Sequence, residues 1–268
     1  MLGLGPSGVG LRGFESHPPH HPLLMFVLFC KSFYLRESKK VSNLLKGGVN
    51  LAKVTWFGHA CWLVEGSPVE GETIRVVMDP HDGACVGLKK PEVSAEIVLV
   101  SHSHFDHNHP DVVKGFKKVI DRPGSYNIGN FHVKGVAVKH DEKDGSLRGD
   151  NIVYVFELDG IKFCHVGDLG HIFTEEQIEK IGKVNVLFVP VGGVYTVDAE
   201  GATVVAEQLN ANIVIPMHYK LPGLSVGIGS LEPFLTGKKV KKAGSNTTSI
   251  TKNELPKETE VLVFEYLT

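Results

Sequence analysis

SHSHFDHNHP, residues 101–110, directly follows the apolar run IVLV and is the most informative stretch of this chain. It carries four side chains in an HxHxDH pattern: His102, His104, Asp106 and His107. Two His residues spaced two apart in an extended segment point to the same side, while the Asp-His pair at the following turn can reach a second point. The spacing therefore predicts two metal ions held side by side.

The composition is that of an ordinary globular protein, with one excess. Of 268 residues, 42% are hydrophobic and 22% charged, the net charge is −2, and 14 residues are His. These values exclude collagen-like, coiled-coil and disordered classes. Without an excess of positive charge or an apolar run of about 18 residues, nucleic-acid and membrane partners are not expected. Histidine is a common metal ligand, so its excess points to the same site.

The four cysteines and the first 50 residues bear on compartment and domain organisation. The cysteines form no CxxC pair, which favours neither a disulfide framework nor a thiolate zinc site and fits a cytoplasmic protein. Residues 1–50 form an atypical leader, rich in Gly, Pro and His, whose apolar run lacks the basic segment that precedes it in an export signal. Gly13–Ser16 can be back-translated to a transfer-RNA T-arm sequence. We therefore expect the leader to be disordered or to precede the true start, and residues 51–268 to form a single domain.

Regular β-rich runs begin at Leu51. Predicted strands lie at 53–57, 61–65, 73–79, 97–102, 132–140, 152–158, 161–168, 184–191, 212–218 and 261–266, and predicted helices at 110–119, 175–181 and about 198–210. For the first helix, Asn108 is the expected cap and Pro110 an early helical residue. This order predicts sheets that pack together, with helices outside.

Further metal-binding residues follow strands along the chain. They are Asp79 in VVMDP, His140 in VAVKHDEKDG, Gly167-Asp168 in CHVGDLGH and His218 in VIPMHYK. Together with HxHxDH, this order resembles the metallo-β-lactamase superfamily. Three further segments resemble the branch that includes L-ascorbate-6-phosphate lactonases: WFGHACWLVE, VPVGGVYTVDAEGA and IVIPMHYK. The resemblance covers residues 53–268. It implies an α+β fold, a four-layer αββα sandwich, with the site at one edge between the sheets.

The resemblance also implies a ligand set and an activity. One metal would be bound by His102, His104 and His140, and the other by Asp106, His107 and His218, with Asp168 bridging. Imidazole and carboxylate ligands suit two divalent ions, zinc first, with manganese or iron as alternatives. Such a pair activates water, which predicts a metal-dependent hydrolase of a small, anionic ester, lactone or phosphoester, with Asp106 and Asp168 as catalytic residues.

Other residues are candidates for supporting or substrate-binding roles. Asp79 is expected to orient a ligand His by a hydrogen bond, and His59 either lines the site or makes a structural hydrogen bond. The backbone of Gly193, in a Gly-Gly loop, could receive an anionic substrate, and Tyr219 and Lys220 would lie at the mouth because they follow His218. Arg148 is either a further anion-binding residue or solvated. His165 precedes Asp168 by three residues in an alternating strand, so it should face away from the site.

Two alternative functions remain open on sequence alone. A phosphodiesterase or nuclease of the same fold would use the basic run Lys238–Lys242, which otherwise is a solvated loop. An iron-dependent, oxygen-reactive protein is the other alternative. The sequence leaves the substrate, the metal and the oligomeric state undetermined.

Overall fold

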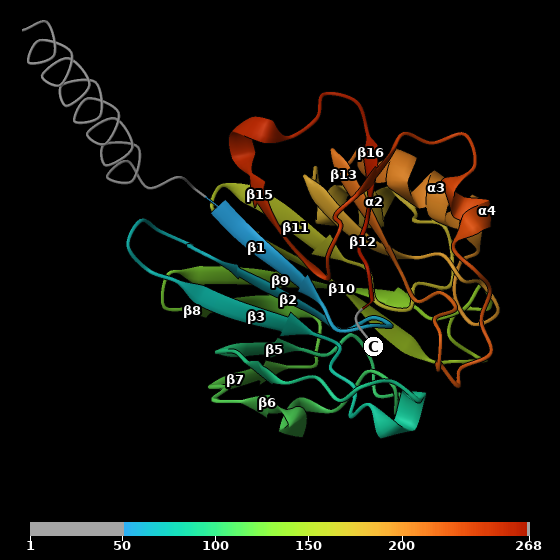
Figure 1. Cartoon of the computed structure of the whole chain (residues 1–268), viewed down its shortest axis with the longest axis horizontal. Helices are drawn as coiled ribbons and strands as arrows, with labels where there is room; N and C mark the ends of the chain where they lie inside the picture. Colours follow the sequence, from blue (N-terminus) through green and yellow to red (C-terminus); the bar gives the residue numbers. More distant parts are fainter. Residues whose placement is uncertain (1–50, 267–268) are drawn as a thin grey trace, which may run out of the picture. The chain divides into compact units, whose positions relative to one another are not determined.

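The computed structural model describes residues 51–266, so the leader lies outside the described part of the chain. Two β-sheets face each other across this part (Figure 1). The first sheet has six strands, in the order β15 (Thr247–Thr251), β1 (Leu51–Trp56), β2 (Trp62–Gly66), β3 (Ile74–Met78), β5 (Ile97–Leu99) and β7 (Lys118–Ile120). Neighbours from β15 to β3 are antiparallel, whereas β3, β5 and β7 are parallel.

The second sheet has eight strands. Their order is β14 (Val240–Lys242), β16 (Glu260–Val263), β13 (Ile213–Met217), β12 (Val186–Pro190), β11 (Ile161–His165), β10 (Asp150–Leu158), β9 (Phe131–Lys139) and β8 (Gly124–Ile128). Strands β8 to β11 pair antiparallel, and β11 to β14 pair parallel. Every strand predicted from the sequence is present, with its ends shifted by a few residues.

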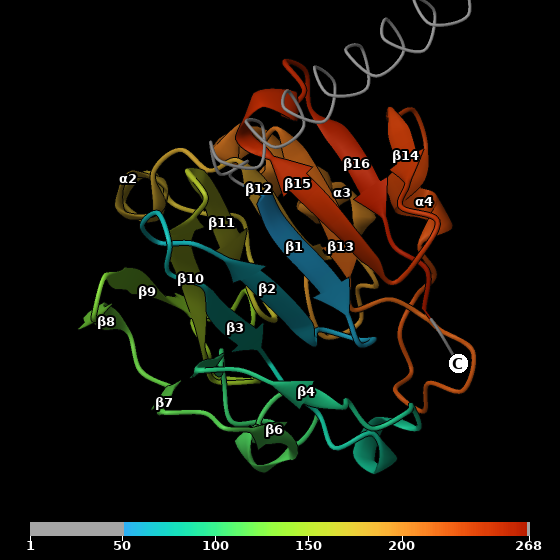
Figure 2. The same ribbon diagram turned by 60° about the vertical axis from the view of Figure 1, so that its left-hand side comes forward.

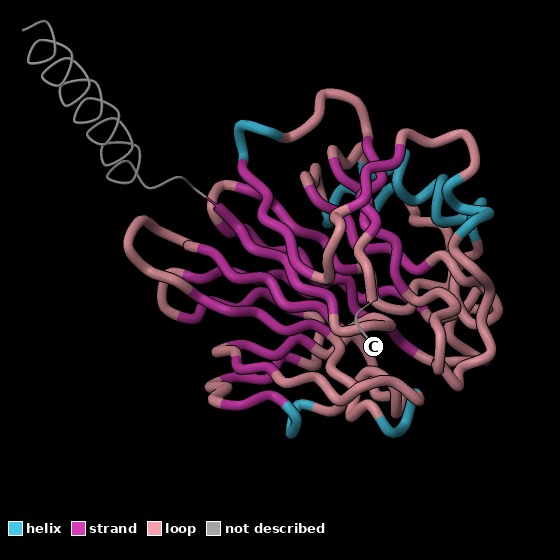
Figure 3. Tube along the Cα trace, viewed as in Figure 1, coloured by secondary structure: helices cyan, strands magenta, loops and turns pink. Residues whose placement is uncertain are grey.

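In the part of the chain that the structure describes, two α-helices pack against the eight-stranded sheet and a third packs against one of them (Figures 2 and 3). They are α2 (Glu175–Ile181), α3 (Ala199–Leu209) and α4 (Glu232–Leu235). The predictions of the first two are confirmed. Thr174 and Gln177 form a capping box at α2, and the Asp198 carboxylate accepts the Gly201 N–H at the start of α3. No helix within residues 51–266 is long and apolar enough to cross a membrane.

The predicted helix at 110–119 is wrong. Its chain forms a 3₁₀ turn, η2 (Pro110–Val112), then β6 (Val113–Lys114) and β7, and the Asn108 side chain does not cap it. Gly115 has φ 74°, which ends any right-handed helix, and Lys118–Ile120 instead pairs with β5. Strand β6 pairs with β4 (Val93–Ser94), and both pack on the six-stranded sheet on the face where a helical layer was expected. A further 3₁₀ turn is η1 (Ala84–Val86).

The core lies between the two sheets and is rich in aromatic side chains. Trp56 stacks on Trp62 with ring centroids 5.3 Å apart, and Trp62 contacts Phe188 of the facing sheet at 4.9 Å. The Tyr154 hydroxyl lies 2.9 Å from the Val100 carbonyl oxygen and 2.8 Å from that of Ile120, so it joins the second sheet to the ends of β5 and β7. This side chain therefore fixes the two sheets relative to each other at the edge where β5 ends.

Candidate metal centre

The predicted ligands meet because they follow strand ends at one edge of the fold. Asp79 follows β3 and His102 follows β5, and these two strands are parallel. His140, Asp168 and His218 follow β9, β11 and β13, which all run in the same direction through the second sheet. Carboxyl ends of such strands share one edge, which is where open α/β sheets commonly carry their sites.

Three histidines form the first group of potential ligands. One ring nitrogen from each of His102, His104 and His140 lies within 4.8 Å of the others. His102 and His140 are buried, and His104 is partly exposed. Burial lowers the pKa of His102 to about 3, so its imidazole is neutral and can donate a lone pair. This group matches the set assigned to one metal from the sequence.

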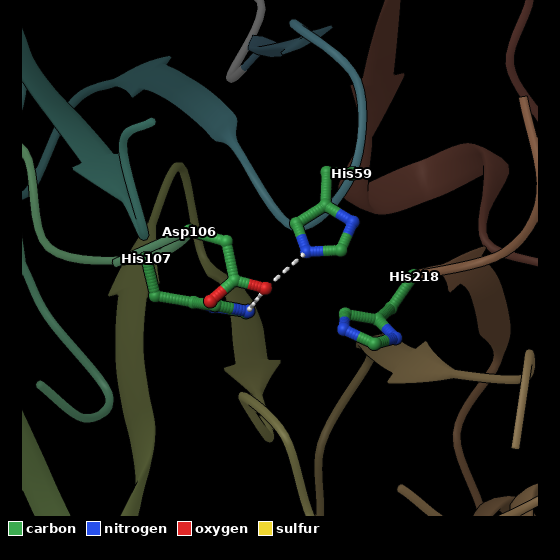
Figure 4. A group of neighbouring side chains, drawn as sticks. All are labelled: His59, Asp106, His107 and His218. Atoms are coloured by element: carbon green, nitrogen blue, oxygen red, sulfur yellow. Dashed lines mark hydrogen bonds and ion pairs between the residues drawn. The ribbon is translucent and has the colours of Figure 1, made fainter. Parts of the chain in front are cut away.

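A second group contains four buried residues (Figure 4). They are His59, Asp106, His107 and His218. The Asp106 Oδ2 atom lies 3.0 Å from Nε2 of His59 and 3.6 Å from Nε2 of His107. This group contains the set assigned to the second metal, with His59 added.

Asp168 lies between the two groups. Its Oδ2 atom is 3.4 Å from His140 Nε2 of the first group, and 3.4 Å and 3.1 Å from the Nε2 atoms of His107 and His218 of the second. Burial raises the pKa of Asp168, but the charges of His107 and His218 outweigh it and hold that pKa well below its ordinary value. A carboxylate that faces both groups is suited to bridge two cations.

Several buried donor atoms of the site make no hydrogen bond. His102 Nε2, His107 Nε2 and Asp168 Oδ1 are buried without a hydrogen bond within the described residues. Buried polar atoms are normally satisfied, and His102, His107 and Asp168 each offer one atom within 4.8 Å of the others. The donor set thus fits divalent metal ions on the structure's own evidence.

Asp79 lies behind the ligands, as expected. Its Oδ2 atom is 3.1 Å from His107 Nδ1 and 2.7 Å from His165 Nε2, while Oδ1 accepts the Ser101 N–H at 2.7 Å. Burial raises the pKa of Asp79, but His165 and His107 lower it by more, so the group is a carboxylate. His165 contacts the same Oδ2 atom of Asp79 as His107 does and belongs to neither group of potential ligands, a role that no sequence motif indicated.

His59 contacts Asp106 directly. Burial and the neighbouring His218 lower the pKa of His59 to about 3, so the neutral ring donates its Nε2 proton to Asp106 Oδ2. Its ring centroid lies 4.2 Å from that of His218. Of the two roles left open by the sequence, His59 makes the hydrogen bond, to a potential metal ligand, and it is fully buried and does not line the cavity.

Three predicted substrate residues lie elsewhere. Tyr219 is only 5% exposed and packs on Trp56, so its prediction as a residue of the mouth is wrong. Lys220 donates from Nζ to the Leu224 carbonyl, and neither it nor Gly193 lines the cavity over the ligands. Directly after His218, whose backbone is left-handed with φ 52°, Tyr219 turns into the core, whereas Lys220 is exposed.

A cavity of about 530 Å³ opens over the ligand groups. Ligand side chains on its wall are His104, Asp106, His140, Asp168 and His218. Phe105, Leu147, Arg148, Tyr195 and Val226 complete much of the lining. Sequence reasoning missed Phe105 and Leu147, although an apolar residue inside a polar motif is a usable signal of a binding surface.

The structure brings a third set of potential ligands together, outside this cavity. Asp82, Cys85 and His109 each offer one atom within 4.8 Å of the others. Burial and Asp82 raise the pKa of the Cys85 thiol to about 11, so it is protonated near neutral pH. None of the three lines the cavity, so we do not assign them to the candidate metal centre.

Two facing sheets with paired His/Asp groups at the strand ends define a metal-dependent hydrolase of the metallo-β-lactamase superfamily. Residues 53–218 match the model of the beta-lactamase superfamily domain, and the chain belongs to this family.

Similar proteins agree with this assignment. A structure from Thermotoga maritima, assigned to the Zn-dependent hydrolases of the metallo-β-lactamase superfamily, is 42% identical with a TM-score of 0.65, over 81% of this chain and 100% of that one. A metal-dependent hydrolase of Thermoplasma volcanium is 29% identical, over 62% of this chain and 83% of its own. A metal-dependent hydrolase structure from Parabacteroides distasonis, at 16% identity and a TM-score of 0.55 over 81% of this chain and 94% of that one, shares the fold.

Proposed function

We propose that this protein hydrolyses a small ester, lactone or phosphoester with a dinuclear metal centre. The observation that carries the proposal is the position of Asp168 Oδ2, which lies within 3.4 Å of a histidine nitrogen in each of two separate ligand groups. One ion would be held by His102, His104 and His140, and the other by Asp106, His107 and His218. Asp168 would be shared between them.

The metals would supply one part of the chemistry. When bound at these residues, two such ions would lower the pKa of a bound water towards neutrality and offset the negative charge that develops on the substrate oxygen. Zinc is the first choice for this nitrogen-rich set, and manganese and iron also accept imidazole and carboxylate ligands. The buried donor atoms that lack partners support an ion at each group.

The protein's own groups supply position and proton control. Asp79 accepts hydrogen bonds from His107 and Ser101 and so fixes the ring of a ligand. The pKa of Asp106 is lowered, chiefly by His107 and His59 against the opposing effect of burial, so Asp106 is ionised and can accept a hydrogen bond at the cavity wall. No side chain of the site needs to serve as a nucleophile.

Substrate size and compartment complete the proposal. The cavity suits a small molecule, and none of Lys238, Lys239, Lys241 and Lys242 lines it, so nothing in the described residues favours a nuclease.

We also propose a cytoplasmic location, because Cys61, Cys85 and Cys164 are free thiols, as expected in a reducing compartment.

The test is a metal assay coupled to a substrate screen. We expect the purified protein to bind close to two equivalents of zinc or manganese and to hydrolyse at least one member of a panel of lactones, phosphodiesters and thioesters. His104→Ala should abolish turnover and reduce bound metal, whereas His132→Ala, which removes an exposed histidine outside the cavity, should change neither. Unchanged metal content and activity in His104→Ala would refute the ligand assignment.

A further inference from the structure

The segment between β9 and β10, residues 140–149, is wound around one buried carboxylate. Asp141 is 3% exposed, and its Oδ1 atom accepts the N–H groups of Lys143 and Gly145 at 2.8 and 3.0 Å. Its Oδ2 atom accepts those of Leu147 and Arg148 at 3.0 and 2.8 Å. Because Asp141 directly follows the ligand His140, this loop is fixed relative to the metal centre.

The loop carries Arg148 into the cavity that contains the ligands. Within residues 51–266, Arg148 is the only lysine or arginine that lines this cavity. One guanidinium nitrogen, Nη2, donates to the Val194 carbonyl at 3.2 Å, and Cζ lies 5.6 Å from the centroid of the Tyr195 ring. No carboxylate oxygen of the described residues lies within 4.0 Å of the guanidinium. A positive group with several unused N–H donors therefore lines the same cavity as the two groups of potential ligands.

Val194, whose carbonyl oxygen accepts the hydrogen bond from Arg148, has a strained backbone. Val194 has φ 67°, a left-handed conformation that is unfavourable for a β-branched residue, and its side chain is 63% exposed. Such strain persists only where surrounding structure imposes it, and it clusters at binding sites. Here it aims the Val194 carbonyl at the guanidinium and places the Tyr195 ring beside it.

Apolar side chains complete the cavity wall. Phe105 is 62% exposed, Leu147 60% and Tyr195 43%, although all three are large and hydrophobic or aromatic. They line the same cavity as Arg148 and the ligands. Large exposed apolar side chains that share one concave surface are typical of a ligand-binding site.

We infer that Arg148 recognises an anionic group of the substrate, a carboxylate or a phosphate monoester, while Phe105, Leu147 and Tyr195 hold an adjoining apolar group. This inference rests on the proposed function, because it places the scissile bond of that substrate over the ligand groups. The planar fork of N–H donors suits the two oxygens of a carboxylate or a phosphate. Of the two roles that the sequence left open for Arg148, this is the anion-binding one.

Binding can be tested without turnover. Metal-loaded wild type is titrated by calorimetry with 3-phenylpropionate, phenyl phosphate and the neutral 3-phenylpropionamide. We expect at least one anion to bind about tenfold or more tightly than the amide, and the stronger of the two identifies the anion. Arg148→Met should lose this preference and retain the weak binding of the amide. The matched control is Lys143→Met, which removes the same charge from an exposed position of the same loop outside the cavity.

Turnover then separates this inference from the proposed function. Against a hydrolysed substrate, Arg148→Met should lower kcat/KM for the anionic form by about 10- to 100-fold. For the uncharged form, the methyl ester of a carboxylate or the dimethyl ester of a phosphate, kcat/KM should change less than twofold. Equal losses on both forms, or an undiminished anion preference in Arg148→Met, would overturn the role of Arg148. Anion-selective binding that depends on Arg148 in a protein that hydrolyses nothing would support this inference and refute the hydrolase.

Discussion

Single residues at the centre adopt backbone conformations that their side chains disfavour. His59, Asp79 and His218 have φ values of 52°, 45° and 52°, in the left-handed region that non-glycine residues seldom occupy. Each residue follows a strand or a strand turn and contacts another member of the site. The strain turns these side chains back towards the ligands, and the hydrogen bonds of the site hold them there.

Asp79 provides a test at the residue scale. Asp79→Asn removes the charge that pairs with His107 and His165, so His107 loses its fixed orientation and part of its basicity. We expect metal affinity to fall about 10- to 100-fold, measured by titration against a competing chelator. Asp111→Asn, at a surface carboxylate, is the control and should bind metal as wild type does. An affinity for metal that is unchanged in a folded Asp79→Asn protein would show that Asp79 does not position the ligand.

Secondary-structure elements were predictable where local patterns decide them. The cap residues Thr174 and Asp198 and the apolar runs of the β-strands are local signals, and the structure follows them. The segment 110–119 was mispredicted because its outcome depends on pairing with β5, a long-range contact. Strands β8, β14 and β15 were missed for the same reason: their partially polar sequences become strands through their neighbours.

Tyr154 tests how the elements are joined. Tyr154→Phe removes the buried hydroxyl that contacts two carbonyl oxygens at the ends of β5 and β7. We expect the free energy of unfolding to fall by about 1–3 kcal/mol, because buried carbonyls lose a partner. Urea denaturation measures it. The control is Tyr126→Phe, because the Tyr126 hydroxyl contacts a carbonyl at the surface. It should lower the free energy of unfolding by less than half as much. Equal decreases in the two variants would contradict the role of burial.

At the scale of the described domain, the two sheets bring together donors that lie far apart in the chain. Asp79 and His218 are separated by 139 positions, and their side chains belong to different sheets. The buried imidazoles and carboxylates at this edge need partners, which metal ions would provide. Folding and metal binding should therefore be coupled.

Metal removal tests this coupling. At free metal about 1,000 times the Kd, binding stabilises the folded state by about 4 kcal/mol, which raises the Tm of a domain of this size by roughly 8–16 °C. Scanning calorimetry of chelator-treated and zinc-reloaded protein should show this difference. His104→Ala should show a smaller shift, and a Tm in wild type that does not respond to zinc would argue against a buried metal centre.

The sequence alone determined the superfamily, the two-sheet fold and the group of residues from which the site is built. HxHxDH and the later Asp and His residues are local patterns whose chemistry is set by residue type. Only the tertiary structure decided which residues line the cavity. Tyr219 turns into the core, His59 reaches Asp106, and Arg148 lies over the ligands on a loop held by Asp141, because long-range packing and hydrogen bonds set side-chain direction.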